Sequence, residues 1–233
     1  MEAKKILTID EHELEISTRA DEIDIKTENK LMREIVSELK RALKANNLTA
    51  LSAPAIGYNK RIFVVDFKDS EIKTFINPII SNAKGLQLSK ETCSSIPGKT
   101  FIRPRNNDIT IMYQRPLGQI ETRQIVGLAA IVIQHELDHL DGLLLSDVGL
   151  EIDEAYDNAT DEEREELIKA YIESLDIKSK ELDKEIKENK ELKEMSDAID
   201  FMTSVYKGET KLEGQEEAKE KLEKELKENT KKK

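Results

Sequence analysis

Residues 134–142 read Gln134-His135-Glu136-Leu137-Asp138-His139-Leu140-Asp141-Gly142. Residues four apart stack on one face of a helix, so His135 and His139 can present their imidazoles to one metal ion. Glu136 then lies beside the ion, where its carboxylate can move protons without being a ligand. Two of the three histidines in the chain occupy this spacing. The segment therefore predicts a metal site on a helix, against the alternative of two histidines that hold no ion.

A hydrolytic metal site needs a third protein ligand and one position left open for water. Cys93 is the only cysteine of the chain, which excludes an internal disulfide and suits a ligating thiol; its alternative is a small buried apolar residue. We expect Cys93, His135 and His139 to hold one divalent ion, with Glu136 as the general base and then the acid. Such an ion activates water and polarises a carbonyl, so the pattern predicts hydrolysis of an amide.

Three other polar residues are candidates for a place near this site. Gln134 and Asp138 can orient the ligands, or they can be ordinary polar positions of a helix. His12 lies outside any motif, so we expect it to take no part in the site.

The hydrophobic pattern predicts an α+β fold. Leu31, Ile35, Leu39 and Leu43 recur at a helical spacing, so a helix is expected from Thr27 to about Asn47. Strands are expected where short β-branched or aromatic runs lie between turn residues, at 61–66, 74–77 and 108–113. A second helix is expected from about Thr122 into the histidine segment, with Gly142 as its stop.

The charge of the chain is concentrated in its C-terminal part. Residues 151–233 hold 27 acidic against 17 basic residues, a net charge of −10 out of −11 for the whole chain. We therefore expect a catalytic domain at 1–150 and an acidic helical extension at 151–233, with helices at 160–190 and 195–206 and a helical or disordered end at 208–233. Thr160 to Glu163 form a capping box that starts the extension. Neither part offers the concentrated positive surface that phosphate binding needs, so no nucleic-acid partner is expected.

Three segments resemble the signatures of the peptide deformylases, the enzymes that remove the formyl group from the initiator methionine of nascent chains. QHELDHLDG at 134–142 matches the third signature of the family without a break. ETCSS at 91–95, with Ile102-Arg103-Pro104 downstream, is similar to the second. LSAPAIG at 51–57 is similar to the first. The resemblance covers about residues 4–150 and implies small antiparallel or mixed sheets around a central HExxH helix, with the charged extension added.

The resemblance also implies roles for particular residues. Cys93, His135 and His139 would hold the metal, with Fe²⁺ ahead of Zn²⁺ or Ni²⁺, and Glu136 would be catalytic. Glu91 would pair with Arg103 and brace the cysteine loop. The backbone N–H of Ser94 would stabilise the oxyanion, and the substrate-binding segment would include Leu51, Ile56 and Gly57.

The chain departs from the family pattern near the substrate. Ala55 stands where the family has a glutamine that donates to the developing oxyanion, a loss that typically costs about 10²–10³ in rate. Leu48 and Ala50 replace two glycines, while Thr92 and Ser94 replace a glycine and a leucine. Each of these four changes adds bulk or polarity where the substrate is expected.

Two main interpretations follow. The first is an active deformylase with an N-formylmethionyl peptide as its substrate, in the cytoplasm of a bacterium or a phage-infected host. The second is a deformylase fold with weak or no activity, used as a structural or interaction protein, such as a phage virion component; Ala55 and the acidic extension favour it. A weaker third interpretation is hydrolysis of another small amide. Residues 160–206 would bind a protein partner or self-associate, and the chain lacks the long apolar run of a membrane span.

Overall fold

The computed structural model describes residues 3–68 and 71–188, and for 176–188 it describes the backbone only. The chain divides into two compact units, residues 1–168 and 169–233. Of the elements in the described residues, the first unit contains all the strands and the helices up to the first turns of α6 (Asp161–Glu188). The boundary expected after residue 150 stays a prediction, and the helix expected at 195–206 and the end at 208–233 lie outside the described residues.

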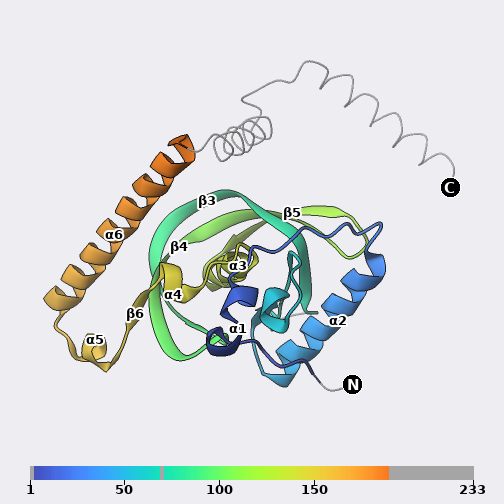
Figure 1. Cartoon of the computed structure of the whole chain (residues 1–233), viewed down its shortest axis with the longest axis horizontal. Helices are drawn as coiled ribbons and strands as arrows, with labels where there is room; N and C mark the ends of the chain where they lie inside the picture. Colours follow the sequence, from blue (N-terminus) through green and yellow to red (C-terminus); the bar gives the residue numbers. More distant parts are fainter. Residues whose placement is uncertain (1–2, 69–70, 189–233) are drawn as a thin grey trace, which may run out of the picture. The chain divides into compact units, whose positions relative to one another are not determined.

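One six-stranded antiparallel sheet forms the frame of the first unit (Figure 1). Its path runs β1 (Ala50–Ser52), β2 (Ile62–Val65), β3 (Lys73–Cys93), β4 (Ile96–Gln114) and β5 (Ile120–Val126). The short β6 (Leu150–Ile152) pairs with the other end of β4, at Thr100–Ile102. β3 and β4 form one long hairpin that curves around helix α3 (Leu128–Leu140). The α+β fold class is confirmed, and the paired strands of the described residues are all antiparallel.

The predicted helix at 27–47 is confirmed as α2 (Asn29–Ala45). Its buried face packs against β1 and β2, while α3 packs on the opposite side of β2. Successive side chains of a strand point to opposite faces, so Ile62 and Val64 enter the α2 core and Phe63 and Val65 enter the α3 core. This explains why β2 is an unbroken apolar run.

The prediction of a helix that begins near Thr122 is wrong for the residues before Leu128. Residues 120–126 form β5, which pairs with β4 from Asp108↔Val126 to Gln114↔Ile120. Gly127 then adopts a positive φ of 67°, and α3 starts only at Leu128. The paired neighbour supplies the backbone hydrogen bonds of this segment, so tertiary context overrides the helical spacing of Ile125 and Leu128.

Short helices complete the described part of the chain. They are α1 (Ile9–Ile16), the 3-10 turn η1 (Pro54–Ile56), α4 (Leu145–Val148) and α5 (Glu154–Asn158). The predicted capping box before α6 is confirmed, because Thr160 N donates to Glu163 Oε2 at 2.8 Å and Glu163 N donates to Thr160 Oγ1 at 3.3 Å. Within residues 3–68 and 71–188, no helix is both long and apolar enough to cross a membrane.

Candidate metal centre

Two neighbouring elements bring three donor side chains together. His135 and His139 lie on one face of α3, with ring centroids 5.0 Å apart. Cys93 is the last residue of β3, and a two-residue turn joins it to Ile96, its partner on β4. The turn directs the buried thiol at α3, where Cys93 Sγ lies 3.2 Å from His139 Nε2. Among the described residues, these three form the group that could hold a metal, with ligand atoms within 4.8 Å of one another.

Electrostatics favours the thiolate at this position. Burial acts to raise the pKa of Cys93, but the charge of His139 and hydrogen bonds from both histidines lower it to about 5. Burial also acts to lower the pKa of His135, yet Cys93 and Glu91 raise it to about 10. A cation bound here would displace the proton of His135, because a ligating imidazole is neutral.

The donor set fits a late first-row transition ion, since thiolate and imidazole are ligands that Fe²⁺, Ni²⁺ and Zn²⁺ accept. His135 Nδ1 is 2.9 Å from Glu91 Oε2, which leaves its Nε2 for an ion, as ligating histidines usually require. The Nδ1 atom of His139 is buried with no hydrogen-bond partner among the described residues.

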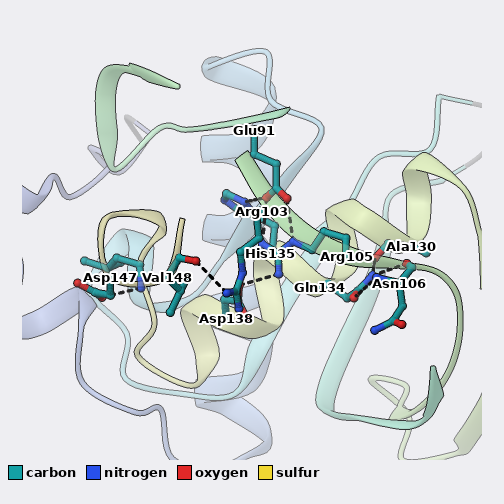
Figure 2. Close-up of polar contacts among 11 residues, drawn as sticks. Glu91, Arg103, Arg105, Asn106, Ala130, Gln134, His135, Asp138, Asp147 and Val148 are labelled. Carbon is teal, nitrogen blue, oxygen red and sulfur yellow. Dashed lines mark hydrogen bonds and ion pairs between the residues drawn. The ribbon is translucent and has the colours of Figure 1, made fainter. Parts of the chain in front are cut away.

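The predicted pairing of Glu91 with Arg103 is wrong. Arg105 binds Glu91 instead, with Nε and Nη2 donating to the two carboxylate oxygens at 2.8 and 2.9 Å (Figure 2). Arg103 and Arg105 share one face of β4, since they are two residues apart. The guanidinium of Arg103 is turned to the carbonyl of Val148, the last residue of α4. The sequence alone does not show which of the two arginines pairs with Glu91, because both carry the same charge and the choice depends on where their partners lie.

Asp138 belongs to the support of the site. Arg105 Nη1 donates to its Oδ2 at 2.6 Å, so one buried guanidinium joins Asp138 to Glu91. Burial acts to raise the pKa of Glu91, but hydrogen bonds from His135 and Arg105 lower it to about 2. Gln134 has a structural role between α3 and β4. Its side-chain amide donates to Asn106 O at 2.7 Å and to Ala130 O at 2.9 Å, and its side-chain oxygen accepts from Asn106 N. It ties α3 to β4.

Glu136 is nearly inaccessible to solvent, with 6% of its surface exposed. Burial raises its pKa, although the charges of His135 and His139 oppose that shift. The hydroxyl of Ser52 is fully buried and close enough to favour the charged form of Glu136, although no hydrogen bond of standard geometry joins the two. Ser52 could not be predicted as a neighbour of Glu136 from the sequence, because a serine on a strand carries no signal of its own.

The first-signature residues line up along β1 and η1. The side chains of Leu51, Ala55 and Ile56 are buried in the α2 core, while Gly57 is exposed. Ser94 is exposed in the turn after Cys93. The catalytic and substrate-binding roles expected for these residues stay predictions. His12 lies on α1, where Nδ1 is 3.3 Å from Glu15 Oε1, and it is not in the donor group.

A thiolate and two imidazoles around one point, with a buried carboxylate on the same helix, are the arrangement of a metal-dependent hydrolase. Comparison with known proteins identifies the family, because the model for polypeptide deformylase matches residues 3–153. The chain belongs to the peptide deformylase family.

Relatives and solved structures agree with this assignment. The chain is 35% identical over 136 residues to a peptide deformylase of Dictyoglomus thermophilum, a match that covers 58% of this chain and 87% of that relative. A probable peptide deformylase from Synechococcus phage S-SSM7 has 30% identity and a TM-score of 0.57, covering 63% of this chain and 99% of that one. The deformylase of Thermotoga maritima has 26% identity and a TM-score of 0.58, covering 64% and 98%. The residues that the family model matches, 3–153, lie within the first unit.

Proposed function

We propose that this chain removes the N-formyl group from the initiator methionine of nascent peptides. The observation that supports this function is the grouping of Cys93, His135 and His139 within 4.8 Å, on a chain that the deformylase family model matches. We also propose Fe²⁺ as the ion, with Zn²⁺ or Ni²⁺ as alternatives. A divalent ion held by these residues would supply an activated water and polarise the formyl carbonyl.

The protein groups around the ion have separate roles in the reaction. Glu136 takes the proton of the attacking water and passes it to the leaving amine, and its raised pKa suits both steps. Glu91 keeps the ring of His135 in one orientation through its contact with Nδ1. The Ser94 backbone N–H is the proposed oxyanion donor, and Ala55, which has no polar group, is the reason to expect a slow enzyme.

The substrate and location follow from this reaction. The substrate would be an N-formylmethionyl peptide, bound along Leu51 to Gly57, in the cytoplasm of a bacterium or a phage-infected cell. Binding of a protein partner or self-association through residues 160–206 remains a proposal, and 189–206 lie outside the described residues. No observation on the described residues favours the structural alternative over the enzyme.

Formate release from formyl-Met-Ala-Ser by protein loaded with Fe²⁺ without oxygen tests the proposal. We expect turnover in the parent and loss of at least about 10²-fold in Glu136→Gln with the metal retained, because only proton transfer is removed. Glu151→Gln, at an exposed ion pair with Lys99, is the control and should keep full activity. A parent that holds stoichiometric metal but releases no formate would show that the proposed function is wrong.

A deformylase of Synechococcus elongatus, 26% identical to this chain, has been solved in complex with actinonin. Binding of actinonin by calorimetry is therefore a second test. It reports on an accessible metal site even where turnover is slow.

A further inference from the structure

The side chain of Arg103, on β4, contacts two other elements of the first unit, α4 and α3. Its side chain is 18% exposed, its Nη1 donates to the carbonyl oxygen of Val148 at 3.0 Å, and its Nη2 lies 3.7 Å from Asp138 Oδ2. Its Nε is buried with no hydrogen-bond partner in the described part of the chain. Figure 2 shows Arg103 between Val148 and Asp138, with Arg105 beyond Asp138. Because Arg105 already satisfies Glu91, Arg103 is available for a different task.

Asp138 connects Arg103 to the metal site. Its carboxylate accepts from Arg105 at 2.6 Å, Arg105 binds both oxygens of Glu91, and Glu91 Oε2 is 2.9 Å from His135 Nδ1. A continuous series of polar contacts thus runs from the carbonyl of Val148 to a ligand ring (Figure 2). Two guanidinium groups alternate with two carboxylates along it, so their charges balance.

Val148 is the last residue of α4, and the chain continues from it through β6 into α5 and α6. The next residue, Gly149, is packed so closely that an added Cβ would come within 2.7 Å of Leu145 O and 3.0 Å of Phe101 Cβ. β6 follows at once and pairs with Thr100–Ile102, the three residues just before Arg103. Strand pairing and the Arg103 contact therefore fix the same short segment, 148–152.

We propose that Arg103 is a positioning residue that couples this segment to the metal site through Asp138, Arg105 and Glu91. The coupling rests on the proposed metal site. Displacement of 148–152 would then weaken metal binding, and by reciprocity metal binding would order that segment. Arg103 itself touches no donor atom of the site.

The balance of charges explains why this residue matters. Without Arg103, the carboxylates of Asp138 and Glu91 share one guanidinium, that of Arg105, in surroundings that are largely removed from water. The guanidinium of Arg105 then shifts toward Asp138, and Glu91 holds His135 less firmly. Partners of ligating histidines typically change metal affinity by 10- to 100-fold when mutated, and a residue further along the series is expected to have a smaller effect, of about tenfold.

Metal affinity, measured by chelator competition, is the first readout, on the full chain. Arg61→Met is the matched control, because Arg61 also binds α3 from a mostly buried position, donating to Leu140 O at 3.1 Å and to Asp141 Oδ1 at 2.7 Å. Arg61 is not in the series that leads to His135. We expect Arg103→Met to weaken metal binding about tenfold and Arg61→Met to leave it within about twofold. Arg103→Lys, which keeps the charge but not the forked geometry, serves if the Met variant does not fold.

Amide hydrogen exchange of residues 148–152 with and without metal is the second readout. We expect metal to slow exchange there in the parent and in Arg61→Met, and to have no such effect in the Arg103 variants. Equal affinities in the parent and the Arg103 variants, or exchange in 148–152 that ignores the metal, would overturn the coupling while leaving the deformylase function intact. A parent that binds metal but releases no formate overturns the function, and the exchange data then decide the coupling alone. A parent that takes up no metal overturns both.

Discussion

The carboxylate of Glu91 is held in its charged form by two partners. Its pKa of about 2 lies below the ordinary value of 4.5, as hydrogen bonds from His135 and Arg105 outweigh burial. A carboxyl whose pKa is lower in the folded state stabilises the fold fully above its unfolded pKa. That stabilisation is lost as the pH falls toward the folded pKa.

We therefore expect metal-free protein to lose about 3 kcal/mol of stability between about pH 5 and pH 2 through this group. Glu91→Gln should be less stable than the parent at pH 7, with a difference that shrinks as the pH falls. Urea denaturation at a series of pH values gives both curves. If the unfolding free energies of the parent and the variant fall in parallel as the pH is lowered, the loss of stability at acid pH does not come from Glu91.

A single substitution at Ala55 offers a gain-of-function test. Ala55→Gln would restore an amide donor on η1, and we expect formate release to rise at least about tenfold, since one oxyanion donor is worth about 2.7–4 kcal/mol at best. Ala55 is buried, so the new side chain must reach past the core. Ala53→Gln, at a fully buried position two residues away, controls for general disruption.

An unchanged rate in Ala55→Gln, with metal and fold intact, would show that this position no longer faces the substrate. The bulkier residues Leu48, Ala50 and Thr92 would then be the first candidates for a reshaped pocket.

The donors of the site were predictable because local spacing carries the signal. His135 and His139 are four apart on one helix, and Cys93 is the only thiol, so both facts can be read without coordinates. The pairing of Arg105 with Glu91 and Asp138 could not be predicted, since it depends on the register of β3 with β4 and on the position of α3.

At the scale of elements, the end of α3 depends on one glycine. Gly142 has φ +73°, and a Cβ there would lie 2.4 Å from the Ser17 carbonyl oxygen and 2.9 Å from Arg19 N. Gly142→Ala thus combines backbone strain with a clash that no side-chain movement can relieve. We expect a loss of roughly 2–5 kcal/mol of unfolding free energy.

Gly98→Ala separates the two effects. Gly98 also has a positive φ, of 78°, but nothing lies within 4 Å of its added Cβ. This variant should lose only roughly 1–2 kcal/mol. Chemical denaturation measures the unfolding free energy of both variants. Equal losses of unfolding free energy would mean that the clash with residues 17–19 does not contribute.

The sheet shows what an element pattern can and cannot predict. Strands near 61–66, 74–77 and 108–113 were expected, yet β3 and β4 continue without interruption over Lys73–Cys93 and Ile96–Gln114. Polar residues and Gly85 fill the middle of β3, so its sequence reads as a loop. Pairing with β4 supplies the backbone hydrogen bonds of this segment. The side chains of β3 alone do not reveal that pairing.

For the whole molecule, a bound ion is expected to contribute to stability. A ligand that binds only the folded state stabilises it by about 2.7 kcal/mol at a concentration 100 times its Kd. For a domain of this size we expect removal of the metal with a chelator to lower Tm by roughly 5–10 °C. Cys93→Ser should show little of this shift, because a hydroxyl is a poor substitute for a soft thiolate. A Tm that is unaffected by the chelator in the parent would contradict a metal held by these three residues.

The long hairpin also sets an order of events during synthesis. Glu91 and Arg105 are 14 residues apart, so the support for the cysteine turn can form soon after both leave the ribosome. Cys93 must wait for His139, 46 residues later, before its thiol has a nitrogen beside it. Chains fold as they emerge, at about 5–20 residues per second. We therefore expect several seconds to pass between the synthesis of Cys93 and that of His139, so the complete set of metal ligands exists only after α3 has been made.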